Sequence, residues 1–254
     1  MSRVGGFTDR HPLVGPVVFI SSCLYFVAQA VAAWVWNPPY SIVTNTISDL
    51  GNTTEPRHVL MNVAFIGLGV IMAAGSVLIY QEYRESSSAE QRAALIGFIL
   101  MGVAGVGAML VGIFPENVNH TAHVAGAAAA IGGGNAAMLV LGWVLVLPGR
   151  LRSFMRLWAP AALVALVLFA CHRDFGIGAG SMERIAAYPE TIWLISFGAF
   201  IAHKHMNPPF LMRRLVTLGK SAGARSPSRP SKQVGGESSV GARPVSPRHP
   251  GGLP

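Results

Sequence analysis

The chain has 254 residues, of which 52% are hydrophobic and only 12% are charged. Soluble domains usually carry about 25% charged residues, so this composition excludes an ordinary soluble domain and predicts an integral membrane protein. The net charge of +8 belongs to the C-terminus, because residues 204–254 hold nine Lys or Arg and one acid. A basic tail without a foldable basic domain argues against nucleic-acid binding, so we expect no nucleic-acid partner.

Six apolar segments reach or approach the roughly 20 residues that cross a bilayer. The sequence therefore predicts an all-α, polytopic six-transmembrane-helix bundle over residues 13–203, after a short N-terminal segment, residues 1–12. In an alternative interpretation, Arg3, Arg10 and Ala28-Gln29-Ala30 belong to a cleavable signal peptide, although the apolar run continues past Ala30. The six segments are Leu13–Trp36, Val59–Tyr80, Ala93–Phe114, Ala122–Leu147, Phe154–Ala170 and Ile185–Ala202.

The distribution of Lys and Arg predicts the orientation of the bundle. With the N-terminus inside, the inner segments hold sixteen Lys or Arg, whereas the outer loops hold only Arg57, Arg173 and Arg184. Cytoplasmic segments carry the excess of positive charge in membrane proteins. We therefore expect both termini in the cytoplasm.

The outer connection after the first span predicts a short interfacial helix. Val43, Ile47 and Leu50 recur at helical spacing and form an apolar stripe,. Gly51 suits the position just after a helix end.

Small residues repeat every four positions in two neighbouring spans. Such stripes allow membrane helices to approach closely, so the two stripes are expected to face each other or another helix. They are Ala104, Ala108 and Gly112 in the third span, and Ala122, Gly126, Ala130 and Gly134 in the fourth.

The C-terminal region divides into two predicted parts. Residues 204–218 form a basic juxtamembrane amphipathic segment, which is expected to contact anionic lipid. In residues 219–254, twenty of 36 residues are Gly, Ser or Pro, and such a composition predicts disorder. The two cysteines, Cys23 and Cys171, lie in apolar segments and are expected to be unpaired.

Ionisable residues near lipid are costly and suggest functional sites, and here they gather at the outer end. Arg184 is expected to hold the Asp49 carboxylate, and Glu190 is placed near the outer start of the sixth span. At mid-membrane depth the sequence shows only uncharged polar residues. The candidate outer polar pocket consists of Asn45, Ser48, Asp49, His123, Glu183 and Arg184.

His120 and His123 share one helical face and are weak candidates for metal ligands. The His-Glu-x-x-His pattern is absent from the sequence,. We therefore expect no metal ion and no cofactor.

Three stretches together resemble a prokaryotic membrane family, Domain of Unknown Function 998. They are Tyr40–Gly51, then Gly112–Pro115 with His123 downstream, and Gly178–Arg184 leading to Pro189 and Trp193. The resemblance implies a six-span fold in the plasma membrane and argues against cleavage at Ala30. Its motif residues correspond here to Asn45, Ser48, Asp49, Gly51, Pro115, His123, Glu183 and Arg184.

The sequence and this resemblance assign no activity, and three classes of function stay open. The first is a non-enzymatic protein with an outward-facing polar pocket that binds lipid or acts with the envelope. The second is an intramembrane metal-dependent lipid hydrolase, and the third is a small-molecule transporter. Membrane lipids are the expected partners, while the ligand and the oligomeric state stay open.

Overall fold

The computed structural model describes residues 11–83 and 88–207. In these residues the regular structure is all helical, with no strand. Residues 208–254, which contain the predicted disordered tail and most of the predicted basic segment, lie outside the described residues. Cys23 and Cys171 are both free, as expected.

Six helical segments are long and apolar enough to cross a membrane, which confirms the predicted bundle. The chain is therefore a multi-pass membrane protein. The first and fourth segments are interrupted, the first at Ser21-Ser22 and the fourth by a turn of π-helix, η2. The segments are α2 (Val14–Ile20) with α3 (Cys23–Trp34), α4 (His58–Tyr83), α5 (Ser88–Ile113), α6 (His120–Ala127) with η2 (Ala128–Gly132) and α7 (Gly133–Val144), α8 (Gly149–Ala170) and α9 (Ala179–Met206).

The last two helices begin earlier than hydropathy predicts. α8 begins at Gly149 rather than Phe154, and α9 begins at Ala179 rather than Ile185. Both early starts include charged residues, such as Arg150 and Glu183, which lower the local hydropathy without ending a helix. Hydropathy therefore underestimates the length of both helices.

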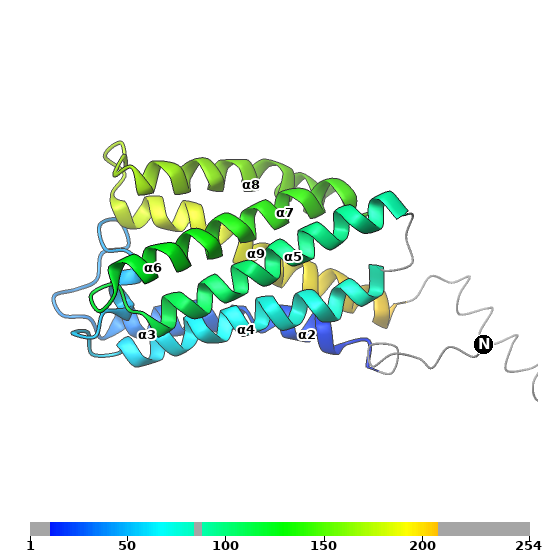
Figure 1. The fold of residues 1–254 in the computed structure, drawn as a ribbon. Helices are drawn as coiled ribbons and strands as arrows, with labels where there is room; N and C mark the ends of the chain where they lie inside the picture. Colours follow the sequence, from blue (N-terminus) through cyan, green and yellow to red (C-terminus); the bar gives the residue numbers. More distant parts are fainter. Residues whose placement is uncertain (1–10, 84–87, 208–254) are drawn as a thin grey trace, which may run out of the picture. The chain divides into compact units, whose positions relative to one another are not determined.

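Helix α9 occupies a central position in the bundle. It packs along α8 and also contacts α2, α3 and α7, while α4 and α5 pair along their length (Figure 1). The loops 35–57, 114–119 and 171–178 gather at one end of the described bundle (Figure 1). We call this the η1 end, after the single 3-10 turn η1 (Ser48–Gly51) that it contains.

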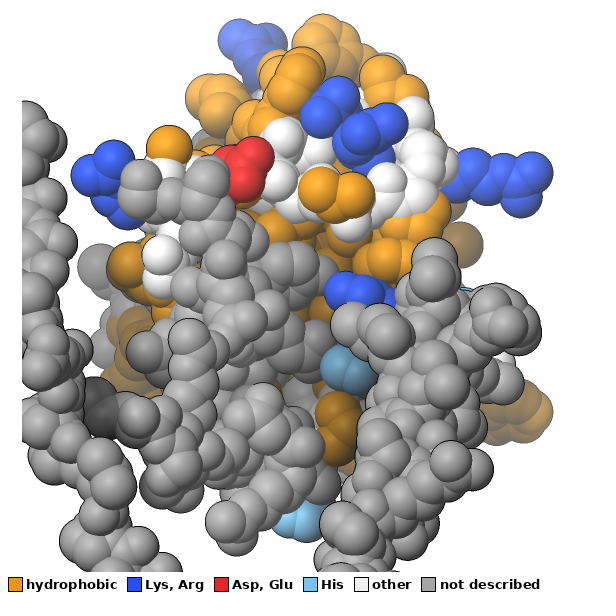
Figure 2. Space-filling model, turned by 90° about the vertical axis from the view of Figure 1, so that its right-hand side faces the viewer, with side chains coloured by type: hydrophobic (Ala, Val, Ile, Leu, Met, Phe, Trp, Pro, Cys, Tyr) orange, Lys and Arg blue, Asp and Glu red, His pale blue; other side chains and the backbone are white. Residues whose placement is uncertain are grey.

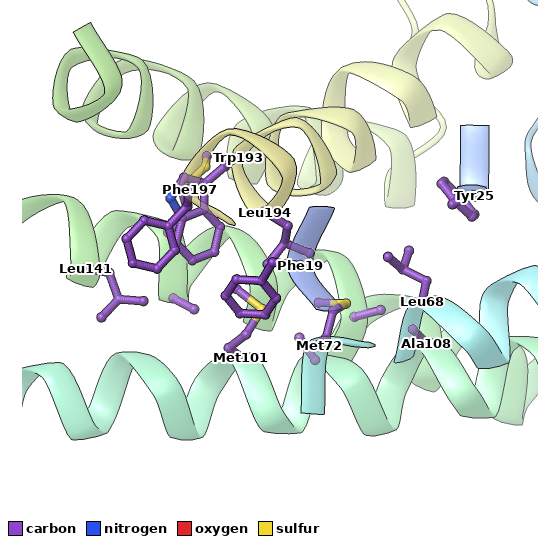
Figure 3. Packing of buried hydrophobic residues seen from close by; sticks show 14 of the residues in the cluster. Phe19, Tyr25, Leu68, Met72, Met101, Ala108, Leu141, Trp193, Leu194 and Phe197 are labelled. Atoms are coloured by element: carbon purple, nitrogen blue, oxygen red, sulfur yellow. The ribbon is translucent and has the colours of Figure 1, made fainter. Parts of the chain in front are cut away.

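Aromatic side chains fill the core between the central helix and its neighbours (Figure 3). Trp193 and Phe197 of α9 stack with ring centroids 5.4 Å apart. Phe19 of α2, which is fully buried, lies 6.2 Å from Phe197. A Cβ on Gly75 would lie 2.2 Å from the Phe19 ring, so the missing side chain makes room for this ring.

The small-residue stripes make close contacts, but not simply with each other. Gly112 packs against the Asn62 carbonyl of α4, where a Cβ would come within 2.4 Å. A close contact of α5 with the fourth segment is instead at Gly107, where a Cβ would lie 2.6 Å from the Gly126 carbonyl oxygen. Helix rotation, which the four-residue spacing leaves undetermined, decides these partners.

The predicted interfacial helix is present only as the 3-10 turn η1, and Val43 lies outside it. Side-chain hydrogen bonds hold the preceding backbone in turns: Ser41 N–H donates to Asn45 Oδ1 at 3.0 Å, and Thr46 N–H donates to Asp49 Oδ2 at 2.8 Å. Asn, Asp, Ser and Thr compete with helix formation in this way. The segment still buries Ile47 and Leu50, as its apolar stripe suggested.

Substitution of Gly105 tests the close packing of α4 and α5. A Cβ there would lie 2.5 Å from the Gly69 carbonyl oxygen and 2.8 Å from the Ala73 nitrogen. We expect Gly105→Ala to lower the free energy of unfolding by about 1–3 kcal/mol, the usual cost of overpacking. Chemical unfolding of the purified protein in detergent measures this loss.

The matched control is Gly67→Ala in α4, because a Cβ on Gly67 meets nothing within 4 Å. This control should be neutral, or more stable by up to about 1 kcal/mol. Equal stabilities of the two variants would contradict the close contact at Gly105.

Candidate functional site

The site at the η1 end is built around Glu183, near the start of α9. Its side chain is 5% exposed and faces the loop between α3 and α4. The carboxylate accepts hydrogen bonds from the Ile47 N–H and from Ser48 Oγ, the latter at 2.9 Å. Glu183 thus fixes the start of η1 against α9.

His123 completes the hydrogen-bonded chain from the other side. Asn119 caps α6, accepting from Ala122 N–H at 3.1 Å, which places His123 on the buried face of the first turns. Its Nδ1 lies 2.9 Å from the Phe114 carbonyl oxygen, and its Nε2 lies 3.1 Å from Ser48 Oγ. A carbonyl only accepts, so Nδ1 carries a hydrogen.

The hydrogen bonds around Ser48 imply that His123 and Glu183 share a proton. The Ser48 hydroxyl has one hydrogen and can donate to only one of its two neighbours, so the other neighbour must donate to Ser48 Oγ. Either an imidazolium lies beside a carboxylate, or a neutral imidazole lies beside a carboxylic acid. Both states hold the same number of protons, so a concerted shift of two hydrogens through Ser48 converts one into the other.

Arg184 holds the same loop in place by donating hydrogen bonds to the loop's carbonyl groups. Its Nη1 donates to the carbonyl oxygens of Ile42, Asn45 and Gly180 at 2.8–3.0 Å, and its Nη2 donates to the Tyr40 hydroxyl. The predicted ion pair with Asp49 does not form.

Asp49 is used locally instead. It accepts from the Thr46 N–H, and the Thr46 hydroxyl in turn accepts from the Asp49 N–H at 3.0 Å. Such a local turn satisfies a short carboxylate side chain without bringing it to Arg184.

The structure therefore brings Ser48, His123 and Glu183 into direct contact, and it places Asn45 and Arg184 beside them through the loop backbone. Gly51 is buried, and its carbonyl accepts from Asn62 Nδ2 at 2.9 Å. The buried Pro115 directly follows Phe114, whose carbonyl orients His123.

The two weak metal candidates do not share a site. His120 is exposed and lies 3.5 Å from Glu116, whereas His123 is buried in the network described above. Across residues 11–83 and 88–207, no three His, Cys, Asp or Glu side chains are grouped as metal ligands.

A partly enclosed cavity of about 40 Å³ adjoins the network. Ser48 and Glu183 contribute to its wall, together with Tyr25 of α3 and Glu190 and Thr191 of α9. The cavity is large enough for two or three water molecules, at roughly 10–15 Å³ each on this measure. Polar groups from the η1 end thus continue into the bundle interior.

Glu190 lies deeper in the bundle than the sequence predicted. Helix α9 is continuous, with Pro189 inside it, so Glu190 is residue 12 of 28 and is 3% exposed. The interior therefore holds a carboxyl group, not only uncharged polar residues. Its seven-residue spacing from Glu183, which places both on one helical face, was the signal available in the sequence.

Comparison with known proteins assigns this chain to a family. A family model described as "Protein of unknown function (DUF998)" matches residues 19–199. The chain belongs to the DUF998 family. No curated protein and no solved structure matches the chain.

The matched region of this DUF998 protein contains every residue of the network. It spans Ser48, His123 and Glu183, and it also includes Arg184 and Glu190. It ends before the basic C-terminal segment. The DUF998 family has no assigned function, so any activity must be argued from the geometry.

Tyr40 makes the stability of this DUF998 protein depend on pH in the alkaline range. The phenol donates to the Thr46 carbonyl at 2.7 Å, and burial raises the pKa of Tyr40 from 10.0 to about 12, although the Arg184 guanidinium opposes the shift. A raised pKa stabilises the folded state fully below about pH 10, and this contribution is lost as the pH rises through about 12. We expect the difference in free energy of unfolding between wild type and Tyr40→Phe to shrink as the pH rises from about 10 to about 12.

Unfolding free energies of both proteins across the alkaline range measure this difference. Tyr80→Phe, which removes a phenol hydroxyl near the other end of α4, is the control variant. Parallel curves for wild type and Tyr40→Phe would show that Tyr40 is not the titrating group.

Proposed function

We propose that this protein binds a membrane lipid with an anionic headgroup, using the surface of α9 near the η1 end. The observation that carries this proposal is a groove of about 290 Å³ between α8 and α9 that has Arg184 at one end. Its wall is otherwise almost wholly apolar or aromatic. The lining residues are Phe154 and Trp158 of α8 with Arg184, Ile185, Tyr188, Pro189 and Ile192 of α9.

The charge of Arg184 supports an anionic partner. Its partners in the described chain are carbonyl and hydroxyl oxygens, and no carboxylate there lies within ion-pair distance of the guanidinium. A cation beside hydrocarbon is costly unless an anion compensates it. A lipid phosphate at this depth supplies that charge.

The shape of the groove suits a lipid tail. From Arg184 to Ile192 the helix rises about 12 Å, which is enough for the upper part of an acyl chain. A second groove of about 180 Å³ reaches Arg184 and Tyr188 from the side of α3. The guanidinium is therefore open to lipid from two sides of α9.

The proposed orientation places the η1 end outside the cell and both termini in the cytoplasm of a plasma-membrane protein. The charge at the opposite end of the bundle supports this orientation, because Lys and Arg side chains outnumber acidic ones on the described surface there (Figure 2). Positive charge favours the cytoplasmic side. The basic C-terminal segment is proposed to contact anionic lipid on that side.

The lipid proposal predicts that Arg184 determines headgroup preference. Phosphatidylglycerol added to the full-length protein in detergent should stabilise wild type more than phosphatidylcholine does, because only the former carries net negative charge. Arg184→Gln should weaken phosphatidylglycerol binding roughly tenfold, equal to about 1.4 kcal/mol. Thermal unfolding at a series of lipid concentrations measures this change.

Two variants make the lipid test specific. Arg57→Gln removes an exposed cation near the same end and should bind as wild type does. Ile192→Trp fills the groove, leaves Arg184 in place and should also weaken binding. If Arg184→Gln keeps the preference for phosphatidylglycerol, the lipid site is not here.

A second candidate function, acyl hydrolysis, is favoured by the contact between Ser48 and His123. A hydroxyl within hydrogen-bond reach of a base, itself oriented by a third group, is the usual arrangement of an activated nucleophile. Here Ser48 Oγ lies 3.1 Å from His123 Nε2, and the Phe114 carbonyl orients the ring. In the state with a neutral His123, Ser48 Oγ would attack an ester carbonyl while its proton passes to His123 Nε2. The imidazolium would then give that proton to the departing alcohol as the ester C–O bond breaks, and water would hydrolyse the acyl-serine.

A fluorophosphonate probe tests the hydrolase directly, since it forms a covalent bond only with an activated hydroxyl. Labelling should occur at Ser48, vanish in Ser48→Ala and fall at least about 100-fold in His123→Ala, the usual contribution of a general base. Ser41→Ala serves as the control in the same loop. If mass spectrometry finds Ser48 unmodified, the hydrolase proposal is wrong while lipid binding stands.

A further inference from the structure

Glu190 is a buried carboxyl group that lacks the partners such a group needs. It is 3% exposed, and its Oε2 makes no hydrogen bond. Across the described residues, no cationic side chain lies within ion-pair distance of it. A carboxylate left alone in low-dielectric surroundings costs far more than its protonated form.

A second unpartnered acceptor, Asn135 Oδ1, belongs to the facing helix. Asn135 is fully buried, and its Nδ2 donates to the carbonyl oxygens of Ile131 and Ala186 at 2.8 and 2.9 Å. These bonds use the amide hydrogens and leave Oδ1 without a donor. Ala186 is one helical turn before Glu190, so the amide lies beside this part of α9.

The neighbouring Gly134 confirms that α7 and the Glu190 carboxyl group are in contact. A Cβ on Gly134 would lie 1.8 Å from Glu190 Oε2, so the glycine leaves space for this oxygen in its observed position. Glu190 Oε2 and Asn135 Oδ1 are thus two acceptors without a donor, on facing helices. A proton on Glu190 turns its carboxyl group into a donor, and a carboxylic acid O–H can donate to an amide oxygen such as Asn135 Oδ1.

The cavity connects this carboxyl group with the η1 end. Glu183 and Glu190 are seven residues apart on α9, about 10.5 Å along its axis, and both line the cavity,. Two or three waters there can bridge most of that distance. The π turn η2 contributes Ala130 and Ile131 to the opposite wall, and π turns often mark functional sites.

We propose that Glu190 is a proton-binding site in the membrane interior, which exchanges its proton with the network of Glu183, Ser48 and His123 through the water-sized cavity. Each transfer conserves protons: His123 Nε2 gives one to Ser48 Oγ as Ser48 gives its own to Glu183. The Glu183 proton then passes along water to Glu190. This site is separate from the lipid groove and does not depend on lipid binding.

Few other groups compete for this proton. Apart from Glu183 and Glu190, only Tyr25 of α3 titrates among the residues that line the cavity. Arg184 and Tyr188 of α9 line the grooves on the lipid side, and His123 of α6 is reached through Ser48. No residue of α4, α5, η2 or α7 in the cavity wall carries a titratable side chain.

Infrared spectroscopy of the full-length protein in lipid nanodiscs tests the site without any assumed activity. Wild type at neutral pH should show the C=O stretch of a protonated carboxylic acid, and the band should shift in D₂O. Glu190→Gln should remove the Glu190 contribution to this band, whereas Glu190→Asp, which keeps the acid, should retain it at a changed frequency; Glu183→Gln separately identifies any contribution of Glu183. Glu116→Gln, at a partly exposed position, is the control and should leave it unchanged.

The route is tested by the rate of H/D exchange of the same band. Ser48→Ala interrupts the hydrogen-bonded chain and should slow exchange roughly tenfold, a barrier about 1.4 kcal/mol higher. Ser196→Ala removes a hydroxyl on the exposed face of α9 and should leave the exchange rate unchanged. A band of unchanged intensity in Glu190→Gln overturns the site, and equal exchange rates in the two serine variants overturn the route.

Discussion

The arrangement of the η1 end depends on two adjacent residues, the acid Glu183 and the cation Arg184. Glu183 accepts hydrogen bonds from the loop that precedes and forms η1, and Arg184 donates to carbonyl groups of that same loop. Backbone groups left unsatisfied near hydrocarbon cost several kcal/mol each. One turn of α9 thus satisfies both the donors and the acceptors of an irregular segment that could not otherwise fold over the bundle.

Glycine makes this contact close enough. A Cβ on Gly180 would lie 2.1 Å from the Asn45 carbonyl oxygen, and Gly178 has a φ of +87°, a conformation that other residues rarely adopt,. The Ser181 N–H then reaches the Val43 carbonyl at 3.1 Å. The glycines at the start of α9 therefore leave space for the loop, and Gly134 leaves space for the Glu190 carboxyl group deeper in the bundle.

Helix α9 presents different chemistry on its two sides. Glu183 and Glu190, two turns apart, line the cavity, whereas Arg184 and Tyr188, one turn apart, line the lipid-facing grooves. The side of α9 that lines the cavity holds the groups that exchange protons, and the side that lines the grooves holds a cation without a carboxylate partner. Lipid binding and proton binding are thus proposed for one helix without sharing a side chain, while Ser48 joins the loop to the interior.

The sequence by itself determined the membrane class, the six helices and the end of the bundle where polar residues gather, because hydropathy and charge are properties of short segments. It also indicated Ser48, His123 and Glu183 through the family resemblance. Only the tertiary structure decided that Arg184 binds loop carbonyl groups rather than Asp49, that Ser48 meets Glu183, and that Glu190 lies in the interior. Partners depend on helix rotation and on the path of the loop, and Asp49 is turned back by its own hydrogen bonds with Thr46.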